Sequence, residues 1–489
     1  MSAANGVHRG ARAPRSNPRV VIVGTGMAGL RVAEAIVERA PRHARLTMLG
    51  TEPDPTYNRI LLSKVLARTA DLGDIELKPA SWYAESGIDL RTATSAAGID
   101  LDRSVVHDEI GETHPYDALV VATGSRPFVP PIEGRDLPHV FRFRTTADAL
   151  AIAAAADRAE RAVVVGGGLL GLEAAAGLLS RGLEVTAVET ADRLMAQQLD
   201  HGGAAMLARE LEGLGLTSLT GRSVTQIHPD RVRLNGGEEL PADLVVVAAG
   251  VRAQTALAAE AGIEVRRGIL VDDELRTSAP GVWAVGECAE HRGTVYGLWA
   301  PLAEQAAVAG ASVLGEPAGF AGADTATTLK IAGIDLFVGG PQAAGPDGEE
   351  IVVSDTRRSV YRKLVLEGSR LAGAIVVNEP QLARRVVELL RTGSEVSAAL
   401  LEPGADAGAD DEDDEEAIVC SCNRVTRGEL VATIAEGELE TVPKVAEATK
   451  ATTGCGSCTG EVEMLIANAS SAGNTDVKEL KLEPAKVEA

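Results

Sequence analysis

Cysteine is scarce in this sequence, with 5 residues among 489. A small secreted protein held together by disulfides is usually much richer in cysteine, so this class is excluded. Four of the five nevertheless lie close together near the C-terminus, at Cys420, Cys422, Cys455 and Cys458. Such a cluster indicates a metal or iron–sulfur site. The fifth, Cys288, has no second cysteine near it in the sequence and is expected to be a small buried side chain.

Long apolar runs are missing as well. No stretch reaches about eighteen uncharged apolar residues, the length expected of a membrane-spanning helix, so no membrane association is expected. Residues 1–17 are polar and basic and lack the apolar segment of a secretory signal. They are expected to form a disordered leader. These absences predict a cytoplasmic protein.

Basic residues are outnumbered. The chain has 47 Lys and Arg against 70 Asp and Glu, which gives a net charge of −23. Nucleic acids are bound largely through cations that neutralise phosphates, so no nucleic-acid partner is expected. Residues 401–416 are rich in Gly, Ala, Asp and Glu and have little to bury. This composition predicts a flexible, self-repelling acidic linker.

The first of two glycine-rich turns in the sequence consists of Gly24, Gly26 and Gly29. A β-rich run at residues 19–23 precedes it, a helical pattern at residues 30–40 follows it, and the next strand ends near Glu52. This order is typical of a dinucleotide-binding unit, because the glycines allow a tight turn, a close approach of the pyrophosphate and packing of the helix on the strand. The helix N-terminus then holds the phosphates.

The second glycine-rich turn repeats the pattern with Gly166, Gly168 and Gly171, after a strand at residues 162–165 and before a helix that ends near Ser180. The following strand ends at Glu189. Its carboxylate would accept hydrogen bonds from ribose hydroxyls and repel a 2′-phosphate, which favours NADH over NADPH. Arg193 lies four residues further on and could soften this preference.

Further strands end in glycine or an acid. Residues 118–121 run into Thr123 and Gly124, residues 243–248 run into Gly250, and residues 282–285 run into Gly286 and Glu287. Beyond them, residues 325–400 are expected to form strands at 329–338, 359–366 and 370–377 and a helix at 381–391. Trp299 and Gln305 are candidates either to close over the flavin or to pack in the core.

The four clustered cysteines form the pattern Cys-x-Cys, 32 residues, Cys-x-x-Cys. Four thiolates can hold a [2Fe–2S] cluster or a structural zinc ion. The single residue between Cys420 and Cys422 is unusual for zinc, whose paired ligands are usually two to four residues apart. A [2Fe–2S] cluster is therefore favoured, with zinc and a disulfide pair as alternatives.

These motifs, in their order, resemble the two-dinucleotide flavoprotein reductases of the glutathione-reductase-like fold. The segments YNRILLSK, YDALVVATGSRP, GGGLLGLE, VVVAAGVR and AVGECA carry the resemblance. Within that group the chain most resembles the NAD(P)H- and FAD-binding half of assimilatory siroheme nitrite reductases and the electron-transfer subunit of assimilatory nitrate reductases. The cysteine pattern is similar to the [2Fe–2S] domain of bacterioferritin-associated ferredoxins.

The resemblance implies an α/β fold with two Rossmann-like domains, a small α+β domain and a small helical cysteine-cluster domain. The implied boundaries are a leader at 1–17, an FAD-binding domain at 18–144 and 268–320, an NADH-binding domain at 145–267, a small α+β interface domain at 321–400, the acidic linker at 401–416, a [2Fe–2S] domain at 417–469 and a loose tail at 470–489.

The resemblance also assigns binding residues. Those implied for FAD are Gly24, Gly26, Gly29, Glu52, Arg59, Lys64, Thr123, Gly124, Gly286 and Glu287. Those implied for NADH are Gly166, Gly168, Leu170, Gly171, Glu173, Glu189 and Gly250. The wider family usually has Asp at the position of Glu287, and a more usual Arg-Pro-Asn run is replaced by residues 251–254, which leaves the role of Arg252 open.

The implied reaction is oxidation of NADH by FAD and transfer of electrons through a [2Fe–2S] centre to a separate assimilatory nitrate or nitrite reductase. No side chain is expected to act as a catalytic acid or base, because the cofactors carry the chemistry. The sequence shows no further cysteine pairs for siroheme, so the chain alone is not expected to reduce nitrite. A reductase of another ferredoxin-like or haem acceptor and a redox- or iron-sensing binding module are the alternatives, and a homodimer is left open.

Overall fold

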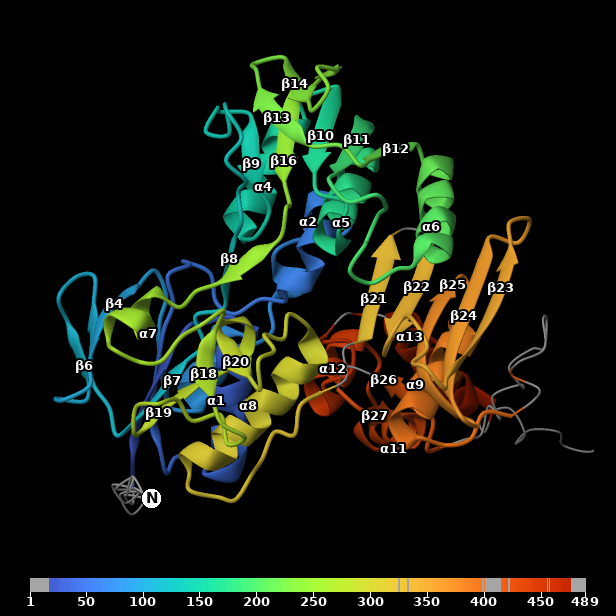
Figure 1. Cartoon of the computed structure of the whole chain (residues 1–489). Coiled ribbons are helices and arrows are strands. Elements are labelled where there is room, and N and C mark those ends of the chain that lie inside the picture. The colour runs from blue at the N-terminus through green and yellow to red at the C-terminus, as the bar shows by residue number, and fades with distance from the viewer. Residues whose placement is uncertain are drawn as a thin grey trace, which may run out of the picture.

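The computed structural model describes residues 17–323, 326–331, 334–397, 400, 415–420, 423–454, 456 and 458–475. Two parallel-sheet domains lie one above the other, and a smaller antiparallel sheet and a helical C-terminal domain lie beside them (Figure 1). Nearly all of the predicted leader and of the acidic linker, and the last fourteen residues of the predicted tail, fall outside the described residues. The predicted fold class is confirmed.

The first parallel sheet has the strand order β19-β7-β1-β2-β3. Its strands are Val282–Ala284, Ala118–Val121, Arg19–Val23, Arg45–Leu49 and Ile88–Arg91. Strands β1 and β7 are almost wholly apolar and buried, as expected of a parallel sheet covered on both faces. One face carries α1 (Met27–Arg39) and α8 (Trp299–Val313), which pack so closely that a Cβ on Gly310 would stand 2.6 Å from the Ala35 Cβ.

The other face of this sheet is covered by an antiparallel sheet of β4 (Ala96–Asp100), β5 (Val105–Asp108) and β6 (Thr113–Pro115). The short helix α7 (Ala256–Glu260) packs on β4. Strands β18 (Ile269–Val271) and β20 (Ala289–His291) form a parallel pair beside the same core.

The second parallel sheet has the order β12-β11-β10-β16-β9. Its strands are Leu216–Thr220, Glu184–Glu189, Arg161–Val165, Leu244–Val247 and Val140–Arg142. Its helices are α4 (Thr146–Ala156), α5 (Leu169–Leu179) and α6 (His201–Gly213). An antiparallel sheet of β13 (Val224–Ile227), β14 (Arg231–Leu234) and β15 (Glu239–Pro241) completes this domain.

The chain crosses between the two domains through an antiparallel ribbon of β8 (Ser125–Pro127) and β17 (Val251–Ala253). The predicted boundaries at 144/145 and 267/268 are therefore misplaced. Strand β9 pairs with β16 of the second sheet, although the prediction gave it to the first domain. Ala258 and Ile263 are buried in the first domain's core, although the prediction gave them to the second. Each strand of the ribbon directly follows a predicted site glycine, Gly124 or Gly250, but neither motif indicates that the chain crosses between domains there.

The third unit is an antiparallel sheet with the order β21-β22-β25-β24-β23, covered by α9 (Pro380–Thr392). Its strands are Ala326–Ile331, Ile334–Gly339, Arg370–Val377, Val360–Glu367 and Glu349–Asp355. The prediction of one strand over 329–338 is wrong, because Ile331 pairs with Ile334 in a tight hairpin of two strands. The nearly unbroken apolar run concealed the turn, for which Gly333 was the available signal.

The third unit contacts the second domain at α6, as Figure 1 shows. The Tyr361 hydroxyl donates to Asp200 Oδ2 at 2.7 Å, and Lys363 Nζ lies 3.3 Å from the same carboxylate. Gly202 also faces the Tyr361 ring, where a Cβ would stand 2.6 Å from Cε2. The small sheet is therefore fixed to the second domain by polar contacts and close packing.

The C-terminal domain consists of β26 (Ile418–Cys420), β27 (Val425–Thr426), α11 (Arg427–Gly437), α12 (Val442–Thr449) and α13 (Thr459–Thr475). Its small core includes Val419, Leu430, Val445 and Val462. Helix α13 continues to Thr475, so residues 470–475 are helical and do not belong to a loose tail. None of the helices that the structure describes has both the length and the apolar character required to cross a bilayer.

Candidate active site with two nucleotide-binding turns

The two glycine turns have the same geometry. Gly24 and Gly166 have φ of +119° and +121°, which favours glycine, and each lies against the end of a neighbouring strand. A Cβ would stand 2.1 Å from the Ala122 carbonyl oxygen at Gly24 and 2.4 Å from the Ala248 carbonyl oxygen at Gly166. Only a glycine is tolerated at either position.

The third glycine of each turn packs the helix on the strand. A Cβ on Gly29 would stand 2.0 Å from the Gly24 carbonyl oxygen, and a Cβ on Gly171 would stand 2.1 Å from the Gly166 carbonyl oxygen. The second glycines, Gly26 and Gly168, differ, because no atom lies within 4 Å of where their Cβ would stand. A pyrophosphate can therefore approach the backbone there, at the N-termini of α1 and α5. The residues present fit two dinucleotides.

A single cavity of about 1980 Å³ joins the two turns. Predicted FAD-binding residues that line it are Gly24, Gly26, Glu52, Arg59, Thr123, Gly124 and Glu287. Predicted NADH-binding residues that line it are Gly166, Gly168, Leu170, Glu173, Glu189 and Gly250. The sequence thus identified side chains from both domains that the fold brings to one space.

Four predicted site residues lie outside the lining. Gly29 and Gly171 lie behind the lining, where they allow α1 and α5 to pack on their strands. Gly286 donates its backbone N–H to Gln305 Oε1 at 2.8 Å. Lys64 is exposed on α2 (Leu62–Leu66). This helix buries Leu62 and Leu66 against α4 and α5 of the second domain, which turns Lys64 to solvent. The structure gives no support to a contact between Lys64 and FAD.

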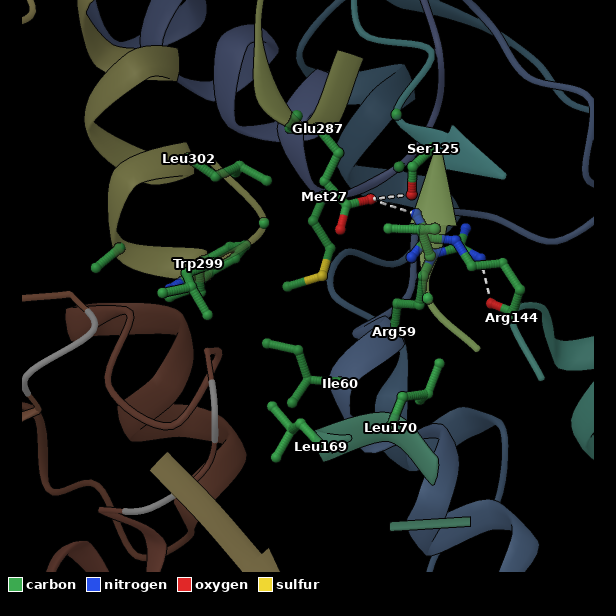
Figure 2. Close-up of a pocket in the computed structure, with 18 of the residues that line it drawn as sticks. Met27, Arg59, Ile60, Ser125, Arg144, Leu169, Leu170, Glu287, Trp299 and Leu302 are labelled. Atoms are coloured by element: carbon green, nitrogen blue, oxygen red, sulfur yellow. Dashed lines mark hydrogen bonds and ion pairs between the residues drawn. The ribbon is translucent and has the colours of Figure 1, made fainter. Parts of the chain in front are cut away.

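Acids and arginines form a connected group on the first domain's side of the cavity. Glu52, just after β2, accepts from the Tyr57 hydroxyl and from Arg59 Nη2, both at 2.5 Å. Arg59 also donates to the Arg144 carbonyl oxygen, and the Arg144 guanidinium pairs with Glu287 (Figure 2). This network holds two carboxylates and two guanidinium groups at the cavity wall, where ribose, phosphate and flavin oxygens need partners.

Ser125 and Arg144 are site residues that the sequence reasoning missed. The Ser125 hydroxyl donates to Glu287 Oε2 at 2.7 Å. Since both side chains orient Glu287, they compensate for the departure from the family's usual Asp at this position. The segment ATGSRP held the signal for Ser125, because this residue directly follows Gly124. Nothing in the local sequence of Arg144 marks it.

Apolar side chains from four elements, α1, α5, α8 and the 3-10 turn Arg59–Leu61, face one another across the cavity. Figure 2 shows Met27 of α1 between Glu287 and Ile60, with Trp299 and Leu302 of α8 on one side. Leu169 and Leu170, at the start of α5, lie beyond Ile60. Such surfaces fit a flat aromatic ring system such as isoalloxazine. Trp299 therefore belongs to the cavity wall, whereas Gln305 is fully buried behind it.

Glu189 lies at the end of β11, beside the second glycine turn. Its carboxylate oxygens accept from the backbone N–H groups of Gly167 at 2.7 Å and Ala191 at 2.8 Å. Arg193 does not line the cavity. Its guanidinium is held by the carbonyl oxygens of Ala196 and Leu199 and by Asp192. The cation that could have accommodated a 2′-phosphate is therefore engaged elsewhere.

Glu173 projects from α5 into the same cavity among apolar neighbours. It is half-buried, and burial raises the pKa of its carboxyl group to about 8. A neutral carboxyl group can donate a hydrogen bond as well as accept one. At neutral pH this side chain therefore offers both functions to an amide or carbonyl group of a ligand in the cavity.

Two of the four predicted cluster ligands lie among the described residues, while Cys422 and Cys455 lie outside them. Cys420 and Cys458 are buried. The Asn423 side-chain amide lies 3.7 Å from the Cys420 sulfur, and the Thr452 backbone N–H donates to the Cys458 sulfur at 3.3 Å. A hydrogen bond with Cys458 lowers the pKa of the Cys420 thiol, which favours the thiolate that a cluster requires. The donor set fits a [2Fe–2S] centre.

Cys288, the remaining cysteine, is fully buried, and its thiol donates to the carbonyl oxygens of Val121 and Val285. Burial raises the pKa of this thiol. The expectation of a small buried side chain is confirmed.

Three family models match parts of the chain. A model for pyridine nucleotide-disulphide oxidoreductases matches residues 18–311. A model for the rubredoxin NAD+ reductase C-terminal domain matches residues 326–394. A BFD-like [2Fe-2S] binding domain matches residues 418–468 and resolves the alternatives for the cysteines in favour of [2Fe–2S] over zinc.

The chain is 39% identical to a nitrite reductase [NAD(P)H] of Bacillus subtilis over 92% of its own length and 57% of that protein. It is also 39% identical to the assimilatory nitrate reductase electron transfer subunit of the same organism, over 92% of its length and 59% of that protein. It thus spans less than two thirds of either relative. Among solved structures, the covalent putidaredoxin reductase–putidaredoxin complex matches with a TM-score of 0.73 and 27% identity, covering 80% of this chain and 97% of that chain.

Proposed function

The chain belongs to the pyridine nucleotide-disulphide oxidoreductase family, and on this basis we propose that it oxidises NADH through FAD and passes the electrons through its [2Fe–2S] domain to a separate assimilatory nitrate or nitrite reductase. It is an oxidoreductase with binding sites for FAD, a nicotinamide nucleotide and a [2Fe–2S] cluster. The acceptor, the preference for NADH and a cytoplasmic location belong to the proposal.

One observation carries this proposal: a single cavity joins the three domains that the electrons must traverse, namely the two domains with glycine turns and the C-terminal domain. Its lining includes both glycine turns and also Asn423, Arg424 and Lys450 of the C-terminal domain. Bound FAD would supply the conversion of a two-electron hydride into single electrons. The protein's part is to hold the groups in order, with Glu189 at the nucleotide's ribose, Glu173 near the nicotinamide, and Arg59 and Glu287 beside the flavin.

The preference for NADH follows from charge. The Glu189 carboxylate lines the cavity beside the second glycine turn, where the proposal places the ribose, and the nearby Arg193 is held by two backbone carbonyls and Asp192. A second anion at this position would be repelled, whereas ribose hydroxyls can donate to the carboxylate.

The acceptor is proposed from the relatives, one of which is described as a nitrite reductase and the other as an electron transfer subunit of assimilatory nitrate reductase. Electrons that leave a [2Fe–2S] domain singly suit a metal-containing reductase. A matching catalytic subunit is therefore the expected partner.

The decisive experiment is an anaerobic NADH titration of the purified protein followed by visible absorption. We expect the flavin band to bleach and the cluster band to fall after it, and a Cys458→Ser variant to show only the flavin change. Addition of a purified assimilatory nitrate or nitrite reductase should then reoxidise both centres of the unmodified protein. Absence of any response to NADH would favour the sensing module, and reoxidation only by a different haem or ferredoxin-like protein would favour the other reductase.

We also propose that the linker at residues 401–416 lets the cluster domain move between the flavin and the external acceptor. The acidic composition and length of this segment support the proposal. Deletion of about half of it should lower turnover with the partner reductase while leaving NADH-dependent bleaching of the flavin intact. Unchanged turnover with the shortened linker would exclude the movement.

A further inference from the structure

One short turn of the first domain faces both the flavin cavity and the C-terminal domain. It consists of Asn58 and the single 3-10 turn Arg59–Leu61. Arg59 and Ile60 line the cavity. Asn58 and Leu61 face the other way, toward the loop at residues 452–458 that carries two of the cluster cysteines. We call this segment, residues 58–61, the seat turn.

Asn58 makes the principal contact between the seat turn and the cluster loop. It is 2% exposed, and its side-chain amide donates to the carbonyl oxygens of Thr453 at 3.0 Å and Gly454 at 2.6 Å. These two residues directly precede Cys455 in the sequence. Leu61 lies beside the same loop, with its Cδ2 3.6 Å from where a Cβ on Gly456 would stand. The two hydrogen bonds of Asn58 thus hold the loop immediately before Cys455 in the sequence.

Arg31 connects the cluster loop to the cavity wall by a second route. Its Nη2 donates to Thr453 Oγ1 at 2.7 Å, and its Nη1 pairs with the buried Glu34 at 2.7 Å. Its guanidinium also lies 4.9 Å from the centre of the Trp299 ring, which lines the cavity. The cation is therefore fixed on three sides, and one of these contacts is to the cluster domain.

The rim of the contact consists of exposed ion pairs. Lys450 Nζ lies 2.6 Å from Glu38 Oε1, and Arg424 Nη2 lies 3.7 Å from Glu304 Oε2. The side chains of Lys450 and Glu38 are 40% and 55% exposed. Exposed pairs of this kind contribute little and weaken with salt. A specific polar centre with a weak ionic rim suits a contact that forms and opens repeatedly.

We propose that the seat turn is the docking position in which the [2Fe–2S] domain receives electrons, and that Asn58 is the positioning residue that holds the cluster loop there. This inference rests on the proposed function. Electron transfer slows steeply with distance, so a loop held against the turn that also borders the flavin site is placed for fast internal transfer. Asn58 is not among the residues that line the cavity, and it acts only through the loop.

The test compares two variants at position 58. Asn58 Oδ1 also accepts from the Ile60 backbone N–H at 3.1 Å, which caps the turn. Asn58→Asp keeps this acceptor but loses both donated hydrogen bonds and sets a carboxylate against two carbonyl oxygens, whereas Asn58→Ala loses the cap as well. In stopped-flow spectroscopy with NADH, we expect unchanged flavin bleaching and cluster reduction slowed about tenfold or more in Asn58→Asp.

Docking itself is measured by carbodiimide coupling of the holoprotein without NADH. The Lys450–Glu38 pair should form a zero-length crosslink, mapped by peptide mass spectrometry, and its yield should fall in Asn58→Asp. Lys444→Gln, on the exposed face of the same helix, serves as the control and should retain the crosslink and the rate. The rim variant Glu38→Gln should slow cluster reduction about two- to fivefold at low salt and have no effect at high salt.

Absence of the crosslink in the unmodified protein, or cluster reduction at the normal rate in Asn58→Asp, would overturn the docking position. If Asn58→Asp does not accumulate as folded holoprotein, a normal rate in Glu38→Gln at low salt would overturn it. A flavin that NADH does not bleach would instead count against the proposed function, while the crosslink would still report on docking.

Discussion

At the scale of single residues, Glu189 carries the proposed preference for NADH. Two backbone N–H groups fix its position, and the only nearby arginine of that loop turns toward backbone carbonyls. We expect Glu189→Ala to raise the KM for NADH about ten- to a hundredfold, because hydrogen bonds to a charged group contribute about 1.5–3 kcal/mol. The measurement is steady-state kinetics with NADH and NADPH and a dye acceptor.

The control for this prediction is Glu184→Gln. It removes the same charge five residues away on strand β11, from an exposed side chain that does not line the cavity. It should leave the ratio of kcat/KM for the two nucleotides unchanged. An unaltered ratio in Glu189→Ala would assign coenzyme choice to another part of the cavity.

Glu173 gives a prediction about pH. Its pKa rises from an ordinary value of 4.5 to about 8 on folding, so the folded protein binds a proton that the unfolded chain releases between these values. Stability supplied by this group is therefore complete below pH 4.5 and declines as the pH rises toward 8, by at most about 1.4 kcal/mol per pH unit. We expect Glu173→Gln, which stays neutral, to match the unmodified protein near the lower limit and to exceed its Tm increasingly toward pH 8.

Thermal unfolding of the FAD-loaded protein across this pH range provides the measurement. Glu184→Gln, an exposed acid on the neighbouring strand β11, is the matched control and should show no such divergence. Parallel Tm curves for Glu173→Gln and the unmodified protein would mean that Glu173 is ionised in the folded state.

At the scale of elements, the two glycine turns allow one substitution to be compared in two places. Gly26 and Gly168 have φ of −77° and −83°, which any residue adopts, and a Cβ on either would meet no protein atom within 4 Å. We expect Gly26→Ala and Gly168→Ala to fold normally but to place a methyl group where a pyrophosphate approaches. Overpacking of about 1–3 kcal/mol corresponds to about ten- to a hundredfold weaker binding.

The two variants should lose affinity for different nucleotides. Gly26→Ala should be purified with little flavin absorbance, whereas Gly168→Ala should keep its flavin and show a raised KM for NADH. Gly98→Ala, at another glycine with open space around it, is the control and should change neither. Equal flavin content in all three variants would contradict the assignment of the first turn to FAD.

The observed elements also show how much of the fold and of the site could be predicted from the sequence. The strand, glycine turn and helix of each nucleotide site are contiguous, so local spacing sufficed to predict Gly24, Gly166 and their partners. Lys64 failed because its direction depends on which domain buries Leu62 and Leu66. Asn58 was not assigned a role because its partners lie about four hundred positions away, at Thr453 and Gly454. Contacts of that separation leave no local pattern.

At the scale of the whole molecule, the cluster domain rests on the first domain through a polar centre and an ionic rim that includes Lys450–Glu38 and Arg424–Glu304. Salt shortens the range of such attractions to about 3 Å at 1 M. We therefore expect the rate of flavin-to-cluster transfer, measured by stopped-flow absorption, to fall as salt rises, while flavin reduction by NADH changes little.

The exposed ion pairs of the rim limit the size of the salt effect on the transfer rate. Exposed pairs contribute about 0–1 kcal/mol each, so the decline should be a few-fold in the unmodified protein and smaller in Glu38→Gln, which has already lost one pair. A transfer rate that is independent of salt would count against the docking position, as would a normal rate in Glu38→Gln at low salt.

The crossing ribbon of β8 and β17 has a consequence for engineering. The chain enters the second domain and leaves it through two hydrogen-bonded neighbours, with Val251 opposite Pro127 and Ala253 opposite Ser125. The nucleotide-binding domain is thus a cassette whose two chain connections lie at one junction. A graft of a related NADPH-selective cassette must reproduce this ribbon, the surface that receives Leu66 and the surface at α6 that receives Tyr361 and Lys363. Coenzyme choice could then be exchanged as one block, while the flavin and the iron–sulfur exit stay as they are.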